Sequence, residues 1–311
     1  MVFGRDRIEY KTLDQIRTMR RAGLVVAAIH DAIRQAIRPG MTTAGLDAIA
    51  RQVLESHQAG SNFLGYHGFP ATICTSINNE VVHGIPSDRQ LQAGDVVSVD
   101  AGATVADASG RLWHGDAAVT YVLGQQGPLA DIGLQASTGL GAGSAPGDAG
   151  EASHVEGGQA RAALELNAVT QQAMWAGIAA LATGKRVGDV GIAVDRLVTS
   201  QPGTYGIVED YTGHGIGTAM HQPPDVPNYA SSHRGPALKS GMCLCVEPMI
   251  TAGSAATQEL ADGWTVTTVD GSLAAHWEHT VAITDAGISV LTAADYGAQG
   301  LRPWGITPVQ V

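Results

Sequence analysis

The chain has 311 residues, 44% of them hydrophobic, and a formal net charge of −11 at pH 7. This length and composition allow a sizeable buried core in one large domain or two modest ones. The negative charge would repel a phosphate backbone, which argues against a nucleic-acid substrate. The charged N-terminus lacks a signal-peptide core and no stretch approaches about 18 uninterrupted apolar residues, so we expect a cytoplasmic protein that does not bind membranes.

The first predicted element is a helix over residues 12–38. Thr12 and Gln15 fit a capping box, and apolar residues then recur at spacings of three and four until a Pro-Gly pair ends the helix. A second helix follows, with Thr42 or Thr43 as its N-cap. Two amphipathic helices therefore precede the first strand-like sequence.

This helix pair has a counterpart later in the chain. Residues 37–53 align with residues 181–197, and each segment is preceded by a helical run and followed by strand-like sequence. The repeated order predicts two related halves of α-then-β type. Between them, Gly, Ala, Ser and Pro make up 21 of the 36 residues from 125 to 160. This composition predicts a flexible surface insertion.

A β-hairpin with two aspartates is predicted over residues 95–124. Asp107 to Gly110 supplies the turn, and a turn centred near residues 108 to 109 puts Asp100 opposite or nearly opposite Asp116. Two carboxylates this close repel unless a cation lies between them. If the turn is displaced, or if one aspartate points to solvent, the two carboxylates do not meet.

Three further polar residues stand in apolar surroundings in the second half. His214 lies among glycines in "TGHGIG", Glu247 near the end of the apolar run in "VEPM", and Glu278 inside "HWEHTVAI". With the two aspartates they form an oxygen-rich set that suits two ions such as Mn²⁺, Fe²⁺ or Co²⁺ rather than a thiolate zinc site. Two such ions can activate one water for attack on a carbonyl.

Several motifs, in this order, identify a family resemblance. "YHGFPATICTSINNEVVHGIP", "HGDAAVTY", "GHGIGTAMHQPPDVPNY", "VEPM" and "WEHT" strongly resemble the type I methionine aminopeptidases. The resemblance extends from about residue 8 to residue 292, interrupted by the segment 125–160. It implies an α+β "pita-bread" fold, in which two pseudo-symmetric α/β halves surround a central antiparallel sheet, and a single catalytic domain over residues 1–311.

The resemblance also implies a role for each candidate metal ligand. Asp100 would bind one divalent ion, His214 and Glu247 would bind the other, and Asp116 and Glu278 would bridge both. The ions would be cobalt, manganese or iron, with zinc as a further candidate. These residues are the same ones that the sequence patterns had selected.

The substrate residues follow from the same resemblance. His83 and His221 would contact the peptide and donate to the scissile amide or to the developing oxyanion, while Glu247 would shuttle a proton. A methionine side chain needs an apolar, polarizable slot. The candidates for that slot, each of which can equally be an ordinary core residue, are Tyr66, Phe69, Cys74 and Trp264.

The other conspicuous histidines receive structural interpretations. His114 is expected on the strand face opposite Asp116, as an orienting or solvated group, and His279 is expected to be orienting or structural. His276 is given no functional role. The odd number of cysteines, without a C-x-x-C pair, argues against disulfides and against a structural zinc module.

The predicted activity is metal-dependent removal of the N-terminal methionine from nascent proteins and peptides, with preference for small second residues. An Xaa-Pro aminopeptidase or prolidase is the alternative, although such relatives carry an extra N-terminal domain and the first helix here begins near residue 12. A non-catalytic binding protein would have lost ligands, and all five are present. We expect a monomer with a transient ribosome contact, for which the acidic charge supplies little positive surface.

Overall fold

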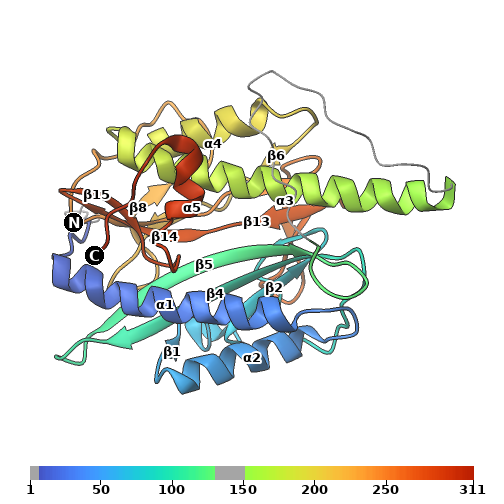
Figure 1. Cartoon of the computed structure of the whole chain (residues 1–311), viewed down its shortest axis with the longest axis horizontal. Helices are drawn as coiled ribbons and strands as arrows, with labels where there is room; N and C mark the ends of the chain where they lie inside the picture. Colours follow the sequence, from blue (N-terminus) through green and yellow to red (C-terminus); the bar gives the residue numbers. More distant parts are fainter. Residues whose placement is uncertain (1–6, 130–150) are drawn as a thin grey trace.

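The computed structural model describes the backbone of residues 7–129 and 151–311 and the side chains of residues 7–129 and 158–311. Two helices followed by a set of strands occur twice along the chain (Figure 1). The helices are α1 (Leu13–Ala36), α2 (Thr43–Ser56), α3 (Glu151–Thr183), α4 (Asp189–Thr199) and α5 (Ala298–Leu301), with short 3₁₀ turns η1 (Tyr66–Gly68) and η2 (Arg302–Trp304).

The strands of the first half are β1 (Gly60–Ser61), β2 (Ile73–Ile77), β3 (Glu80–Val82), β4 (Val96–Ala106) and β5 (Leu112–Val122). The strands of the second half are β6 (Gly206–Ile207), β7 (Gly213–Gly215), β8 (Gln222–Val226), β9 (Cys243–Val246), β10 (Met249–Thr251), β11 (Thr257–Glu259), β12 (Val266–Thr268), β13 (Ala274–His276), β14 (His279–Thr284) and β15 (Gly287–Val290).

In the first half, α1 and α2 cover one face of an antiparallel sheet in which β4 pairs with β1, β2 and β5. The predicted capping box is present, since Thr12 accepts from the Gln15 backbone and Gln15 accepts from the Thr12 backbone. Thr42 is the N-cap of α2. Apolar residues from both helices and from β2, β4 and β5 form one core, which fixes the sheet against the helices.

The second half repeats this arrangement. A second core lies between α3, α4 and the antiparallel sheet of order β15-β14-β9-β7-β8. In Figure 1 the α1–α2 pair and the α3–α4 pair lie on opposite sides, with the sheets between them. The prediction of two similar α/β halves is therefore confirmed in the described residues.

The two halves join where β5 lies beside the start of β14. The Ala118 backbone N–H donates to the Glu278 carbonyl over 3.3 Å, and the Glu278 N–H donates back to Ala118 over 3.0 Å. Thr280 adds a hydroxyl that donates to the Asp116 carbonyl over 2.8 Å. This joint brings the carboxylates of Asp116 and Glu278, more than 160 positions apart in the sequence, into one region.

The insertion differs from its prediction at its end. Helix α3 begins at Glu151, so residues 151–160, which the composition assigned to a flexible segment, are helical. Ala, Glu and Gln have high helix propensity, and they outweigh the lower propensity of Ser153, Gly157 and Gly158 in this stretch. Residues 130–150 lie outside the described part of the chain, where the prediction of a flexible insertion is not tested.

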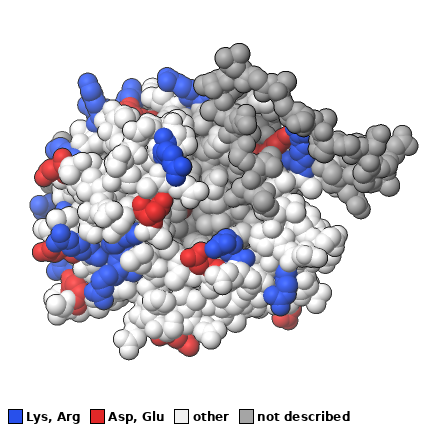
Figure 2. Space-filling model, viewed as in Figure 1, with Lys and Arg blue, Asp and Glu red and all other residues white. Residues whose placement is uncertain are grey.

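The described surface is mixed in charge on the face shown in Figure 2, where basic and acidic side chains are interspersed. Among the described residues, no helix combines the length and the apolar character needed to cross a membrane. The chain carries a net charge of −11, and the face in this view shows no large basic area.

Candidate metal centre and substrate pocket

A cavity of about 210 Å³ lies between the two halves. Strands and loops of both halves contribute its walls, and one end is carboxylate-rich while the other is aromatic. Every residue that the sequence selected as a ligand, catalytic or substrate residue lines it: Tyr66, Phe69, Cys74, His83, Asp100, Asp116, His214, His221, Glu247, Trp264 and Glu278.

The two aspartates lie on β4 and β5 and are nearly opposite each other, which is one of the two predicted arrangements. Asp100 pairs with Ala118, and Asp116 pairs with Gly102, so the aspartates are diagonal rather than directly opposite. In the turn between the two strands, the Asp107 side chain accepts from the backbones of Ser109 and Arg111. Because the diagonal offset is two residues, both aspartate side chains face the same side of the sheet.

Gly102 makes room for Asn62, which lies beside Asp116. A Cβ at Gly102 would lie 2.2 Å from the Asn62 side-chain nitrogen, so only glycine fits there beside Asn62. The Asn62 amide donates to the Gly115 carbonyl over 3.1 Å, and Asn62 also contributes a hydrogen bond that lowers the pKa of Asp116. A polar side chain thus supports the aspartate inside an otherwise apolar strand.

The second half supplies a histidine and two glutamates. Nδ1 of His214 lies 3.0 Å from the Gly215 carbonyl and must donate to it, which leaves the Nε2 lone pair free. Nε2 lies 3.3 Å from Oε1 of Glu247. Burial, with a contribution from His221, lowers the pKa of His214 to about 3, so the ring is neutral and able to bind a metal.

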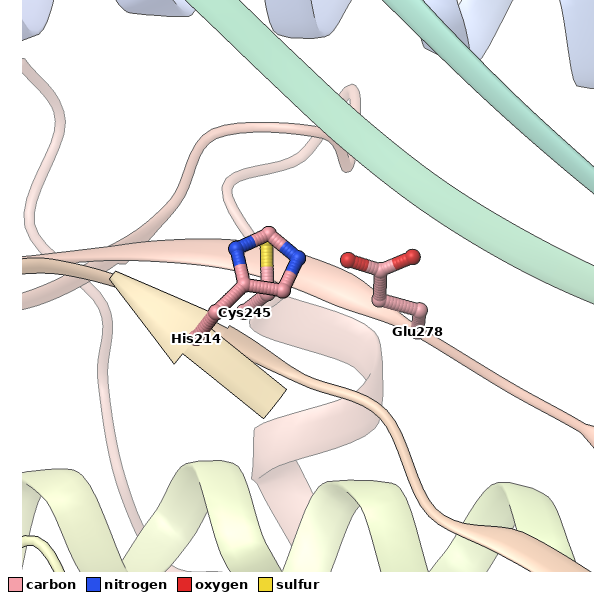
Figure 3. A group of neighbouring side chains, drawn as sticks. All are labelled: His214, Cys245 and Glu278. Carbon is pink, nitrogen blue, oxygen red and sulfur yellow. The ribbon is translucent and has the colours of Figure 1, made fainter. Parts of the chain in front are cut away.

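The ligand atoms form two overlapping groups. Within each group all atoms lie within 4.8 Å of one another: the first contains Asp100, Asp116 and Glu278, and the second contains His214, Cys245 and Glu278. Figure 3 shows the His214 ring and the Glu278 carboxylate facing each other, with the Cys245 sulfur behind the ring. Glu278 is common to both groups, whereas Asp116 belongs to the first.

Asp116, Glu247 and Glu278 are buried, Asp100 is half-buried, and the four carboxylates are incompletely paired. Among the described residues, one oxygen each of Asp100, Asp116, Glu247 and Glu278 has no hydrogen-bond partner. Burial raises the pKa of Asp100 to about 7, and burial followed by mutual repulsion raises the pKa of the other three well above the usual range. Unpaired buried carboxylates are costly, and a cluster of them fits cations held between the oxygens.

The aromatic end of the cavity directly adjoins the carboxylates. Cys74 pairs with Asp100 across β2 and β4, and it packs in an apolar cluster with Phe63, Phe69 and Met220. The Phe69 ring contacts Trp264 edge to face with centroids 5.0 Å apart. Tyr66 and Trp264 pack against this cluster, so the residues predicted for a methionine slot do lie together.

The two predicted substrate histidines lie on either side of this cavity. The Tyr66 hydroxyl is 2.8 Å from Nδ1 of His221, and the His221 ring lies 4.3 Å from that of His214. His83 contacts Tyr211 and has a left-handed φ of 61°. Burial lowers the pKa of His83 to about 4 and also lowers that of His221, so both rings are neutral near pH 7.

Three residues near the site differ from their predictions. His114 and Asp116 are two residues apart on β5, so they share a strand face, and the expected opposite orientation is wrong; Nδ1 of His114 contacts Asn62 over 2.9 Å. His276, given no role, lines the cavity with Nε2 3.8 Å from Glu247. His279 is structural as predicted, since its Nδ1 contacts Thr292 over 2.8 Å.

Cys245 was not selected from the sequence, although a signal was present. It stands two positions before Glu247 in "CLCVEPM", and the period of two in a strand places both on one face. The same rule relates His276 to Glu278 in "HWEH". Thr212 and Met249, which stand in the motifs "TGHGIG" and "VEPM", also line the cavity, as does Tyr211.

Comparison with known proteins agrees with this geometry. The sequence model described as metallopeptidase family M24 matches residues 17–154 and 147–285. The methionine aminopeptidase 1 of Mycobacterium tuberculosis (strain CDC 1551 / Oshkosh) is 44% identical over 294 residues, which are 93% of this chain and 96% of that protein. The chain belongs to the methionine aminopeptidases of metallopeptidase family M24. It is therefore a metallopeptidase hydrolase.

Other M24 members extend the comparison. Methionine aminopeptidase 1 of Bacillus subtilis (strain 168) is 36% identical over 282 residues, covering 91% of this chain and 98% of that protein. The crystal structure of methionine aminopeptidase from Rickettsia prowazekii superposes with a TM-score of 0.74 at 35% identity, over 92% of this chain and 100% of that one.

A prolidase from Pyrococcus furiosus shares the fold alone, with a TM-score of 0.60 at 17% identity, over 92% of this chain and 65% of that one. The predicted pita-bread fold is confirmed, since these M24 enzymes share it.

Proposed function

We propose that this M24 enzyme removes the N-terminal methionine from peptides and nascent proteins in a reaction that needs two divalent ions, with preference for small second residues. The observation that carries the proposal is the contact between an apolar aromatic slot and a buried carboxylate cluster in one cavity, through the Cys74–Asp100 pair. One end fits a thioether side chain, and the other end fits the chemistry of the peptide bond.

The donor set fits a dinuclear centre. Asp100 would hold one ion, His214 and Glu247 the other, and Asp116 and Glu278 would lie between them; the unpaired oxygens of the four carboxylates support this assignment. Mn²⁺, Co²⁺ or Fe²⁺ suits such an oxygen-rich set, with Zn²⁺ as a further candidate. When bound, the ions would supply Lewis acidity and a more acidic water.

The side chains of the cavity would perform the proton transfers. Glu247, next to the neutral Nε2 of His214, would accept a proton from the attacking water and deliver it to the leaving amine. Donation from the Tyr66 hydroxyl to Nδ1 of His221 would leave the ring proton on Nε2, where it can stabilise the oxyanion. His83 would donate at the peptide nitrogen.

Substrate selection follows from the shape of the cavity. The cluster of Phe63, Phe69, Cys74 and Met220, flanked by Trp264, would bury the methionine side chain. A cavity of about 210 Å³ leaves little room for a large side chain at the second residue. The free amine of the substrate would lie at the Asp100 end, so that the enzyme acts only at a chain terminus.

The cellular setting is also proposed. The enzyme would act as a monomer. Nascent chains as substrates would place the enzyme in the cytoplasm, with transient ribosome contact. The mixed charges in Figure 2 supply no large basic area for that contact on the visible face.

One substrate panel tests the proposal. Protein loaded with Mn²⁺, Co²⁺ or Fe²⁺ is incubated with Met-Ala-Ser, X-Pro-Ala and N-acetylated Met-Ala-Ser, and free amino acids are quantified. We expect methionine from the first peptide alone. Cleavage of X-Pro-Ala in preference would favour the prolidase-type alternative, and no release with any of the three metals would overturn the proposal.

A matched pair of variants controls that experiment. Asp116→Asn, in the cluster, should lose bound metal and turnover while the far-ultraviolet circular dichroism stays unchanged. Asp88→Asn makes the same chemical change at an exposed position and should retain both. Full turnover by Asp116→Asn would exclude its role as a ligand.

A further inference from the structure

Cys245 carries a thiol that lies beside the carboxylate cluster. Its Sγ, a ligand nitrogen of His214 and a carboxylate oxygen of Glu278 all lie within 4.8 Å of one another. The residue is completely buried. Figure 3 shows the sulfur directed from β9 toward the level of the imidazole and the carboxylate rather than away from them.

The strand geometry fixes this direction. Cys245 lies on β9 opposite Thr280 of β14, and its Sγ is 3.5 Å from the Thr280 hydroxyl. Cys243, two residues earlier, belongs with Cys245 to one apolar cluster that includes Ile216 and Leu291. Among the described residues, Cys245 and not Cys243 lies in a group of candidate metal-binding atoms.

An independent observation points to a ligand at this place. Oε1 of Glu278 and Oε1 of Glu247 are buried and have no hydrogen-bond partner among the described residues. Nε2 of His214 faces the same space, since Nδ1 is engaged by Gly215. A sulfur, a nitrogen and a carboxylate oxygen around one point are the donors that a borderline-soft divalent ion takes in tetrahedral sites, with Zn–S near 2.3 Å and Zn–N near 2.0–2.1 Å.

We propose that Cys245 supplies a thiolate ligand to the ion held by His214 and Glu278, which makes this half of the centre selective for thiophilic ions such as Zn²⁺ and Co²⁺ over Mn²⁺. This inference rests on the proposed dinuclear metallopeptidase function. On binding, one sulfur–metal bond forms, one S–H bond breaks, and the proton leaves to solvent, without any change in oxidation state. The other half of the centre, at Asp100 and Asp116, keeps oxygen donors only.

Cobalt reports the sulfur directly. Metal-free protein is titrated anaerobically with Co²⁺ while the near-ultraviolet region is recorded, where thiolate-to-Co²⁺ charge transfer absorbs and carboxylate or imidazole ligation does not. We expect this band to grow with one equivalent of Co²⁺, and to disappear in Cys245→Ser and Cys245→Thr while the visible d–d bands of bound Co²⁺ persist. If the wild-type protein binds Co²⁺ without a charge-transfer band, the proposal is wrong, and Cys245 only positions Glu278.

The other two cysteines serve as controls. Cys243→Ser should keep the band, because Cys243 is in neither group of candidate metal-binding atoms among the described residues. Cys74→Ser tests the thiol that pairs with Asp100; loss of the band there and not in Cys245→Ser would assign the sulfur to the wrong residue and overturn the proposal. The two Cys245 substitutions differ in shape, so a folding defect in one leaves the other to decide.

Selectivity gives a second readout. Competition with a chromophoric chelator should show Zn²⁺ affinity falling about tenfold or more in Cys245→Ser, with Mn²⁺ affinity changed much less. Equal losses for both ions would contradict a thiolate ligand. Methionine release from Met-Ala-Ser is measured on the same samples. Methionine release without the charge-transfer band leaves the proposed function intact and removes this inference. The band without methionine release supports the thiolate ligand and removes the proposed function.

Discussion

Replacing Asp100 by Asn should stabilise the metal-free protein at alkaline pH, although it removes a ligand. Burial raises the pKa of Asp100 from 3.8 to about 7. A pKa raised on folding means that the folded state holds the proton more tightly, so this favourable contribution exists at low pH and is lost as pH rises through 7. A shift of about three units corresponds to about 4 kcal/mol at pH 8, which is an upper bound because the residue is partly exposed to the cavity.

Replacing the Asp100 carboxylate by an uncharged amide removes part of this free-energy penalty. Oδ1 of Asp100 has no partner among the described residues, and an unsatisfied buried polar group costs about 1–3 kcal/mol. We therefore expect Asp100→Asn to raise the free energy of unfolding by about 1–3 kcal/mol at pH 8. At pH 5 the wild-type carboxyl is largely protonated, and the advantage should shrink by about 2–3 kcal/mol.

The assay is urea denaturation in a chelator at pH 8 and pH 5, followed by circular dichroism, with Asp88→Asn as the exposed control. Adding Mn²⁺ at pH 8 should reverse the order, because wild-type protein gains binding energy that the variant loses. If Asp100→Asn is no more stable than wild type at pH 8 in chelator, burial does not penalise the Asp100 carboxylate and the reasoning fails.

Three further predictions concern other parts of the structure. Tyr66→Phe removes the hydroxyl 2.8 Å from His221; kcat should fall about tenfold while KM and the melting temperature hold, and an unchanged kcat would rule out this orienting role. Burial lowers the pKa of His30 to about 4, below its unfolded value of 6.5, so stability should fall as pH drops through that window. In urea melts, the free energy of unfolding should therefore fall by about 2 kcal/mol less in His30→Gln than in wild type between pH 7 and pH 4.5. An equal fall in both proteins would contradict this prediction. At Gly23 a Cβ would lie 2.2 Å from a backbone oxygen, so Gly23→Ala should destabilise by about 1–3 kcal/mol, whereas Gly158→Ala in open space should not.

The sequence was sufficient to select the candidate ligands but not to predict their arrangement. Asp100, Asp116 and Glu278 could be chosen because carboxylates inside apolar strands need partners, and the residues did gather in one cavity. Their register could not be fixed, because it depends on how Asp107 closes the turn through its side chain. The diagonal pairing of Asp100 with Asp116 is the result.

Contacts between the halves were not predictable from local patterns. The Ala118–Glu278 backbone pair, which joins β5 to β14, has no sequence signal of its own. His276 and Cys245 were missed for a different reason: each stands two residues before a selected glutamate, and the strand period was not applied to them. The start of α3 at Glu151 was missed because overall composition concealed a short run of good helix formers.

The most direct test of the account is anomalous diffraction from crystals soaked with Co²⁺, recorded at the cobalt absorption edge. The account predicts two peaks inside the cavity, one among Asp100, Asp116 and Glu278 and one beside His214 and Glu247, with Glu278 adjacent to both. Absence of both peaks from this cluster in crystals of protein that releases methionine from Met-Ala-Ser would contradict it.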